Sequence, residues 1–385
     1  MNKISLSRPD ITNKEKSAIL RVLNTPFLAL GPKLKEFEDK FAKFIGTKYA
    51  IAVNSGTSGL HLVIRAMGIK EGDEVITSPF SFIASANCAL FEKAKPVFID
   101  INFKTLNLDP NKIEKVITKK TKAILGVDIF GHPAEWKKIL TIAKKYKLKV
   151  IEDSCEALGA EYKISEKRKA KSEKWVKCGN FGDAAVFAFY PNKQMTTGEG
   201  GMIVTNNSEI ADLCRSMANQ GRKVKNGAWL EHVRLGYNYR MSDINAALGI
   251  AQLSRINEIL RKRQKVAELY NRYLSDMPEI KIPYCAPNAK ISWFVYVIQL
   301  SEKYSRSDRD QIMKKLKGSG IQCSNYFQCI HLQPLYRELF NYKRGDFPVA
   351  ENISDRTIAL PFYNELTEKD IKYIVKSLKN FLSIK

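Results

Sequence analysis

The stretch of sequence that decides the fold is YAIAVNSGTSGLHLVIRAM, residues 49–67. Its first five residues are apolar or aromatic and predict a buried strand, and residues 58–67 have the apolar spacing of a helix. Small and polar residues, beginning at Asn54, connect the two. A strand that passes through a short turn into a helix is half of a βαβ unit, which favours a mostly parallel, buried sheet.

Strand and helix patterns keep alternating on both sides of this stretch. Helices are expected at residues 12–23, 33–45, 83–91 and 135–146, and strands at residues 74–77, 96–100, 122–127, 149–152, 184–189 and 202–205. A long helical pattern follows at 242–277, and then a strand at 293–300, a helix at 308–317, a strand at 321–326 and a helix at 367–382. We therefore expect an α/β protein with a large domain, residues 1–245, whose mostly parallel mixed sheet lies between helices. Residues 246–385 would form the linking helix and a smaller C-terminal α/β domain.

Residues 161–177, EYKISEKRKAKSEKWVK, interrupt this alternation. They are polar, rich in lysine and without a regular apolar period, which is typical of a solvated segment. We expect an exposed insertion or loop here. Its closeness in sequence to Lys193 would allow it to border a ligand site.

The charge of the chain is its unusual compositional feature. The 385 residues include 63 basic and 40 acidic ones, a net charge of +23 at pH 7. Such an excess makes nucleic acid the first partner to consider. The basic residues are spread along the whole chain, however, and no recognition motif accompanies them. A nucleic-acid-binding protein therefore stays only as the alternative from a different class.

Other features exclude several classes of protein. No run of about 18 apolar residues predicts a transmembrane helix, and residues 1–10 lack the apolar region of a secretory signal. The seven cysteines include no CxxC pair, and with four scattered histidines they form neither a zinc pattern nor a disulfide framework. We expect no metal, no membrane partner, reduced thiols and a cytoplasmic location.

Three candidate positions follow predicted strands, where α/β sheets bind their ligands. The turn at residues 54–59 begins a helix, so its amide groups and the helix dipole favour a phosphate. Asp153 ends a buried strand and either caps the next turn or faces a cationic group. Lys193 directly follows an apolar strand and precedes the glycine-rich residues 198–201. In a cleft, such a lysine can lose its charge and become a nucleophile toward carbonyls.

Together these positions match the needs of one cofactor, pyridoxal 5′-phosphate. It requires a phosphate cradle, a carboxylate for its pyridine nitrogen and a lysine that forms a Schiff base. The carboxylate would keep the ring nitrogen protonated, so that the ring accepts electrons when a Cα–H bond breaks. The lysine could then move the proton.

Seven segments are specific in combination. They are NSGTSGLHL (54–62), GDEVITSPFSFIASAN (72–87), VIEDSCEALGA (150–160), FGDAAVFAFYPNKQMTTGEGG (181–201), LGYNYRMSDINAALG (235–249), IHLQPLY (330–336) and ALPFYNELTE (359–368). With them the chain resembles the DegT/DnrJ/EryC1/StrS sugar aminotransferases, a branch of the fold-type I pyridoxal-phosphate enzymes. The resemblance covers nearly the whole chain and implies a transaminase with the fold-type I architecture.

The resemblance also implies roles for individual residues. Lys193 matches the Schiff-base lysine, Asp153 the acid that pairs with the pyridine nitrogen, and Phe82 the aromatic residue that stacks on the ring. Glu156 falls where the family has a polar residue near the phenolic oxygen of the ring. Asn238 matches a residue that reaches the phosphate from the neighbouring subunit, which implies a homodimer with shared active sites. The phosphate-binding turn is matched by Gly56, Thr57 and Ser58.

The substrates implied by the resemblance are a nucleotide-linked keto-sugar and glutamate, with 2-oxoglutarate and an amino-sugar as products. Such a reaction belongs to polysaccharide or glycan biosynthesis. A basic cleft would suit the diphosphate of one substrate and the carboxylates of the other. Arg240 and His331 are the candidates to contact them.

The sequence departs from the family at one position, and two other enzyme classes have to be considered. Ala188 stands where many members carry a phosphate-binding serine five residues before the lysine. Sugar dehydratases of the same family replace the lysine with histidine, and Lys193 argues against that chemistry. A nicotinamide enzyme would need GxGxxG and a suitably placed downstream Asp, which the sequence lacks.

Overall fold

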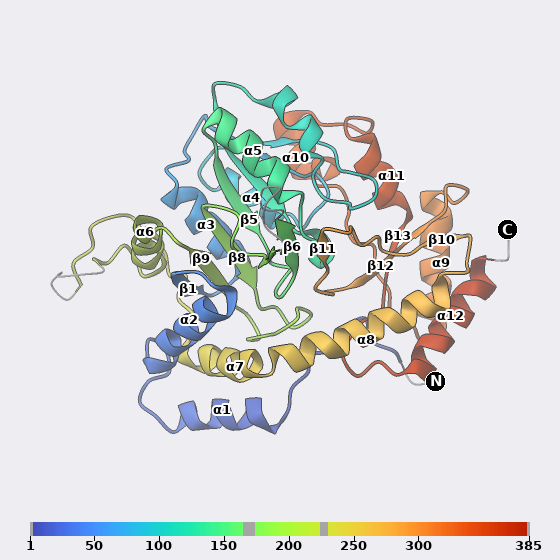
Figure 1. Ribbon diagram of the computed structural model, residues 1–385, viewed down its shortest axis with the longest axis horizontal. Helices are drawn as coiled ribbons and strands as arrows, with labels where there is room; N and C mark the ends of the chain where they lie inside the picture. Colours follow the sequence, from blue (N-terminus) through green and yellow to red (C-terminus); the bar gives the residue numbers. More distant parts are fainter. Residues whose placement is uncertain (1–2, 165–173, 224–229, 383–385) are drawn as a thin grey trace.

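The computed structural model describes residues 3–164, 174–223 and 230–382. A seven-stranded sheet forms the centre of the larger part of the molecule (Figure 1). In spatial order its strands are β1 (Tyr49–Val53), β9 (Gly201–Thr205), β8 (Ala184–Ala188), β5 (Lys149–Asp153), β4 (Thr121–Val127), β2 (Glu74–Thr77) and β3 (Lys95–Phe98). Only β9 runs antiparallel to its neighbours, and the other pairings are parallel. The predicted mostly parallel mixed sheet is confirmed.

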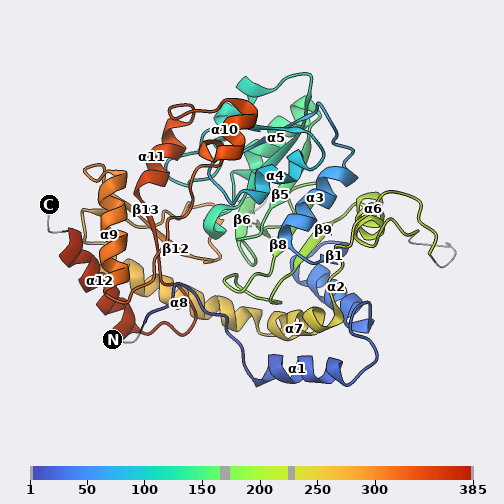
Figure 2. The ribbon, with the colours of Figure 1, turned by 180° about the vertical axis from the view of Figure 1, so that it is seen from behind.

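Helices cover both faces of this sheet, as Figure 1 and Figure 2 show from opposite sides. Alternate residues of a strand point to opposite faces, and in β1 Ile51 and Val53 face one core while Ala50 and Ala52 face another. The first face is covered by α3 (Gly56–Ala66), α4 (Ala84–Leu90) and α6 (Ser208–Ala218). The second is covered by α2 (Pro32–Ile45), α5 (Trp136–Tyr146) and α7 (Asp243–Ser254), with α1 (Asn13–Leu23) packed on α7. A capping box between Thr12 and Glu15 begins α1.

A second core lies at the other end of the molecule, reached by the long α8 (Ile256–Leu274) (Figure 1). Its sheet has the strands β10 (Ile280–Lys281), β12 (Tyr296–Leu300) and β13 (Thr357–Leu360), and its helices are α8, α9 (Arg306–Gly318) and α12 (Glu368–Leu382). The N-terminal residue Ile4 packs into this core. By contrast, α10 (Pro334–Phe340) and α11 (Pro348–Arg356) pack against the large core through Tyr336 and Ala350. The domain boundary at residues 245 and 246 stays a prediction.

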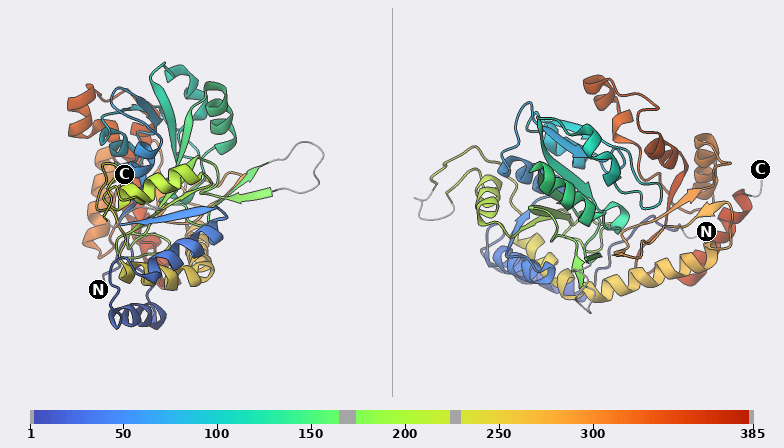
Figure 3. Two further views of the ribbon diagram at one scale, coloured as in Figure 1. Left: turned by 90° about the vertical axis from the view of Figure 1, so that its left-hand side faces the viewer. Right: turned by 45° about the horizontal axis from the view of Figure 1, so that its top comes forward.

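The insertion at residues 161–177 contains strands that the sequence did not predict. β6 (Glu161–Ile164) and β7 (Lys174–Lys177) pair antiparallel, and β6 also pairs with β11 (Ala289–Lys290). The loop prediction was wrong at both ends because Tyr162 is buried in the core beside α5, while the neighbouring lysines obscure the strand pattern. Figure 3 shows the hairpin projecting from the body of the molecule. The rest of the insertion lies outside the described residues.

Two further predictions were wrong in detail. The helix expected at 242–277 is divided into α7 and α8 at Arg255, whose guanidinium pairs with the carboxylates of Asp10 and Glu15. The segment 321–326 is not a strand, since only isolated bridges hold it. They join Ile321 to Ile4 and Ser324 to Ala359.

Among the described helices, none combines the length and the apolar character needed to cross a membrane. All seven cysteines are free; Cys285 is exposed and Cys155 half-buried, while the other five are buried.

Close contact between α2 and α7 depends on one glycine. A Cβ atom at Gly249 would lie 2.6–2.9 Å from ring atoms of Phe37, and that ring is fully buried against Phe41 and Phe189. We expect Gly249→Ala to destabilise the fold by about 1–3 kcal/mol through overpacking, measured by urea unfolding. The matched control is Gly318→Ala at the end of α9, where a Cβ meets nothing within 4 Å. Equal stability of the two variants would contradict this account.

Candidate active site

The side chain of Lys193 lies in the turn that follows β8. Its Nζ is 3.6 Å from Glu156 Oε1 and 3.9 Å from the centroid of the Phe294 ring. The amide of Lys193 donates to Tyr190 O at 2.9 Å, which shapes the turn. Only 13% of the lysine side chain is exposed. One amine is therefore held in a nearly enclosed position beside a carboxylate and an aromatic ring.

A buried guanidinium holds this turn in place. Arg263 of α8 donates to the carbonyl oxygens of Asn192 and Lys193, at 3.4 and 2.9 Å. It also donates to those of Trp293 and Phe294, at 3.4 and 3.1 Å. Burial lowers the pKa of Arg263 to about 10. Nothing in the sequence of this basic helix marks Arg263 as buried, so it was not among the predicted residues.

The carboxylate of Asp153 ends β5, beside β8 in the sheet. Ser85 Oγ donates to its Oδ2 at 2.7 Å, and the amide of Cys155 donates to its Oδ1 at 3.2 Å. Ser81 lies 2.9 Å from Ser85, Oγ to Oγ. These contacts fix the orientation of the carboxylate. The two serines lie before and within α4, and the sequence pattern did not distinguish them from other small core residues.

Glu156 lies on the next turn and faces Lys193. The amide of Phe130 donates to Glu156 Oε2 at 2.8 Å, and Gln194 Nε2 donates to the carbonyl oxygen of Glu156 at 2.6 Å. Burial raises the pKa of Glu156, and the nearby Lys193 ammonium opposes that shift. Burial therefore favours the protonated form of Glu156 more than water favours that of an exposed glutamate.

The predicted phosphate turn forms the N-terminus of α3. Ser55 is the N-cap, and its Oγ accepts from the amide of Ser58 at 3.1 Å. Gly56 and Thr57 occupy the first turn, where backbone amides have no partner within the helix. Together with the helix dipole, these amides form a site suited to a phosphate.

At Gly56 the backbone of this turn lies close to the segments that carry Asp153, Glu156 and Ala188. A Cβ atom there would lie 2.8 Å from the Cβ of Ala188 and 3.0 Å from Cys155 Sγ. Cys155 stands between Asp153 and Glu156 in the chain, so the cradle, both carboxylates and the end of β8 converge. The methyl group of Ala188 takes the place of the serine hydroxyl that many relatives would present.

Phe82 and Asn238 differ in their surroundings. Phe82 is 58% exposed, although the residues just before it are buried. The segment around Asn238 pairs with Asn219, and the carbonyl oxygen of Asn238 accepts from Asn54 Nδ2 at 3.3 Å. Asn238 therefore borders the start of the phosphate turn of its own chain.

The two candidate substrate contacts differ in accessibility. Arg240 pairs with Val53 through the backbone and lines an open cavity. His331 has no exposed surface, and its Nε2 is 3.0 Å from Glu351 Oε1. The position of His331 does not support the predicted substrate contact, because its ring packs against Phe347 in the interior.

Comparison with known proteins shows to which family the chain belongs. Residues 9–379 match the sequence model of the DegT/DnrJ/EryC1/StrS aminotransferase family. This chain belongs to that family. It is 37% identical over 99% of its length to GDP-perosamine synthase of Caulobacter vibrioides, of which it covers 98%.

Solved structures agree with this membership. PseC of Helicobacter pylori, an aminotransferase involved in the biosynthesis of pseudaminic acid, superposes with a TM-score of 0.90 at 30% identity. The match covers 99% of this chain and 100% of PseC. Spr1654 of Streptococcus pneumoniae, in its pyridoxal-phosphate form, superposes with a TM-score of 0.91 at 25% identity, with 99% of each chain covered. The predicted fold-type I aminotransferase architecture is confirmed.

This DegT/DnrJ/EryC1/StrS aminotransferase depends on pyridoxal 5′-phosphate, and its described residues fit that cofactor. Pyridoxal phosphate requires an amine and a carboxylate, and the enclosed amine of Lys193 and the oriented carboxylate of Asp153 supply them. At Gly56, the absence of a Cβ keeps the cradle close to both.

A second pair of carboxyl groups lies beneath the site. Ser154 Oγ is 2.8 Å from Asp128 Oδ2 and 3.0 Å from Glu152 Oε1. Asp128 Oδ1 accepts from the amide of Ala134 and from Trp136 Nε1. One hydroxyl proton cannot serve both carboxylates, so a proton on Asp128 that is donated to Ser154 completes the chain of hydrogen bonds. Burial and the charge of Glu152 raise the pKa of Asp128.

The carboxyl pair predicts a pH-dependent effect of Asp128→Asn. The pKa of Asp128 is raised in the folded state, so its contribution to stability is present at low pH and is lost as pH rises through that pKa. The asparagine amide can donate to Ser154 at every pH. We expect the melting temperature of Asp128→Asn, relative to the unaltered protein, to increase as the pH rises from about 4, the ordinary pKa of an aspartate, toward the raised pKa of the folded state. A difference in melting temperature that stays constant with pH would contradict a proton shared by the pair. Cys178 also faces the two carboxyl groups, so the measurement is made under reducing conditions.

The hydrogen bonds from Arg263 to the Lys193 turn predict that its replacement weakens both the fold and cofactor binding. Arg263→Met leaves four carbonyl groups, two of them buried, without this donor, so we expect a loss of about 3 kcal/mol or more in stability and weaker retention of the cofactor. Thermal unfolding and cofactor absorbance after dialysis measure the two effects. Arg261→Met, at an exposed position of the same helix, is the matched control and should change neither. Full cofactor retention in a folded Arg263→Met protein would contradict the positioning of Lys193 by Arg263.

Proposed function

We propose that this aminotransferase converts a nucleotide-linked keto-sugar into an amino-sugar, with glutamate as the amino donor and 2-oxoglutarate as its product. The observation that carries the proposal is the Lys193 amine, enclosed beside Glu156 and Phe294 and joined through the Gly56 contact to the phosphate turn. GDP-perosamine synthase and PseC, named above, support a sugar as the acceptor. The product would enter polysaccharide or glycan biosynthesis.

In this proposal each site residue has a separate task. Lys193 would hold the cofactor through its side-chain amine, and the same amine, when free, would carry the proton at the substrate Cα. Asp153 would keep the pyridine nitrogen protonated, and Glu156 would face the phenolic oxygen. Phe82 covers the ring. When bound, pyridoxal phosphate supplies an electron sink for the carbanion left after proton loss.

The remaining assignments concern the phosphate, the second subunit and the location. Gly56, Thr57 and Ser58 bind the phosphate through the start of α3. Asn238 reaches the phosphate in a homodimer with shared active sites, and Arg240 contacts an anionic substrate group. Seven free cysteines agree with a reducing compartment, and we propose the cytoplasm.

The lysine is tested by Lys193→Ala. We expect the visible absorption band of the lysine-bound cofactor to disappear and the turnover number to fall by about 10³-fold or more, because both the covalent link and the proton carrier are lost. The matched control is Lys314→Ala, an exposed lysine of α9, which should leave both unchanged. A colourless wild-type protein in the presence of added cofactor would contradict the proposal.

The acceptor is tested with a panel of nucleotide-linked 3-keto and 4-keto sugars. The wild-type enzyme is incubated with glutamate and each sugar, and the amino-sugar is measured by mass spectrometry. We expect transfer to at least one of them. Conversion of glutamate to 2-oxoglutarate without transfer to any sugar would contradict the proposed substrate class while leaving the aminotransferase in place.

A further inference from the structure

A buried histidine joins α3 to the segment that carries Asn238. His61 of α3 is 4% exposed, and its Nε2 lies 2.8 Å from Glu92 Oε1. Its Nδ1 lies 3.2 Å from the hydroxyl oxygen of Tyr239. Burial lowers the pKa of His61, so the ring is neutral at pH 7 and carries a single proton. Nε2 donates this proton to the Glu92 carboxylate, and Nδ1 accepts from the hydroxyl of Tyr239.

The carboxylate of Glu92, just after α4, is the centre of this group. Arg65, one turn beyond His61 on α3, donates to both carboxylate oxygens at 2.9 Å. The hydroxyl of Tyr237 lies 3.5 Å from Glu92 Oε1, and its ring stacks on that of Tyr239 at 4.8 Å between centroids. All five side chains belong to one chain, so their contacts do not depend on a second subunit.

The start of α3 is tied to the same segment through Asn54. The amide of Asn54 donates to the carbonyl oxygen of Tyr239 at 2.8 Å, and its Nδ2 donates to that of Asn238 at 3.3 Å. Asn54 Oδ1 accepts from Ser58 Oγ at 2.6 Å, inside the phosphate turn. The helix that begins with the phosphate turn and the segment that carries Asn238 are therefore joined at two places, Asn54 and His61.

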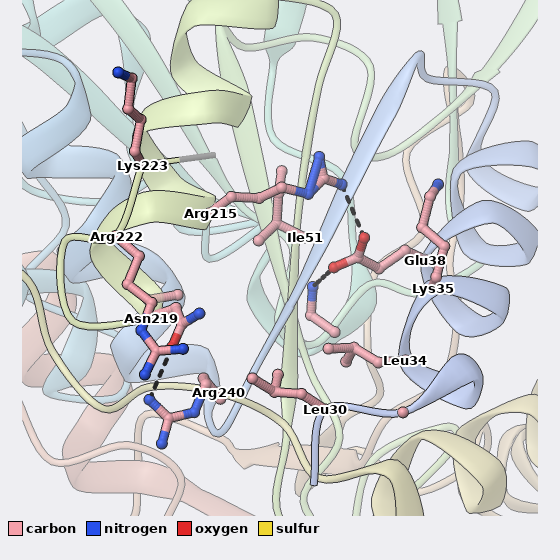
Figure 4. A pocket seen from close by; sticks show the side chains of 13 residues that line it. Leu30, Leu34, Lys35, Glu38, Ile51, Arg215, Asn219, Arg222, Lys223 and Arg240 are labelled. Atoms are coloured by element: carbon pink, nitrogen blue, oxygen red, sulfur yellow. Dashed lines mark hydrogen bonds and ion pairs between the residues drawn. The ribbon is translucent and has the colours of Figure 1, made fainter. Parts of the chain in front are cut away.

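The end of α6 holds the segment from another side. Asn219 forms a backbone bridge with Asn238, and its Oδ1 accepts from Arg240 Nη1 at 3.1 Å (Figure 4). Bridged backbone is extended, so neighbouring side chains alternate between two faces. The tyrosines on either side of Asn238 are half-buried at the imidazole, whereas Asn238 itself is exposed. Anchoring the tyrosines on one face thus directs Asn238 to the other.

We propose that His61 is a positioning residue for cofactor binding, which acts through Tyr239 to hold Asn238 toward the phosphate bound in the second subunit. The inference rests on the proposed function, in which Asn238 reaches that phosphate. His61 touches neither the cofactor nor a substrate in this proposal. Its two hydrogen bonds keep the segment at a fixed place on α3, and without them the contact between Asn238 and the phosphate weakens.

The test compares pyridoxal 5′-phosphate with pyridoxal, which lacks the phosphate. The full-length enzyme is loaded with either compound, and each dissociation constant is measured by equilibrium dialysis. We expect His61→Leu to weaken the binding of pyridoxal phosphate about tenfold and Tyr239→Phe, which removes only the hydroxyl, about threefold, with pyridoxal unaffected. His61→Asn, whose Oδ1 can accept in place of Nδ1, should recover part of the affinity. Tyr373→Phe, which removes a hydroxyl bonded to Ser319 O at 3.0 Å in the smaller core, is the matched control and should change neither constant.

A double variant shows whether the effect passes through Asn238. We expect Asn238→Ala to weaken pyridoxal phosphate selectively, and His61→Leu to add nothing further in the Asn238→Ala background, because coupled residues are not additive.

Three results would overturn the inference. They are equal weakening of pyridoxal and pyridoxal phosphate in His61→Leu and Tyr239→Phe, unchanged phosphate affinity in Asn238→Ala, and losses that add in the double variant. None of these measurements needs turnover. A phosphate-selective loss in an enzyme that aminates no sugar would contradict the proposed substrate and leave the positioning by His61 in place.

Discussion

The interaction on which the site depends is the burial of one positive charge, the guanidinium of Arg263. An unpaired charge in the interior is strongly unfavourable, so the fold must bring hydrogen-bond acceptors to it. The acceptors are carbonyl groups of the Lys193 turn and of the segment that carries Phe294. Because both segments bind the same side chain, Lys193 and the aromatic ring beside it are positioned together, and both are held by α8.

Strand order supplies the rest of the geometry. Parallel strands end at the same edge of a sheet, and β5 and β8 are neighbours there. The carboxylate of Asp153 and the turn with Lys193 therefore lie close together, although they come from different strands. The phosphate turn joins them from β1 because Gly56 permits contact with Ala188 and Cys155. A side chain larger than hydrogen at that position would separate the cradle from the rest of the site.

The edge of the same sheet creates a different environment. β1 has a partner on one side only, β9, apart from a single bridge at Val53. Glu38 and Arg215 satisfy part of this backbone edge, since Glu38 accepts from the amide of Ala52 and Arg215 donates to the carbonyl oxygen of Ala50. An ion pair rather than a further strand therefore closes this part of the sheet edge.

The sequence by itself determined the alternation of strands and helices, the strand-end positions of Asp153 and Lys193 and the capping turn before α3, because these depend on patterns among near neighbours. It missed the break at Arg255 and the paired strands among the lysines of the insertion. Only the tertiary structure decided which charges are buried, since Arg263 meets Lys193 across 70 residues and nothing in a basic helix marks one arginine for the interior. Contacts over such distances arise from packing, and packing is not encoded in any local spacing.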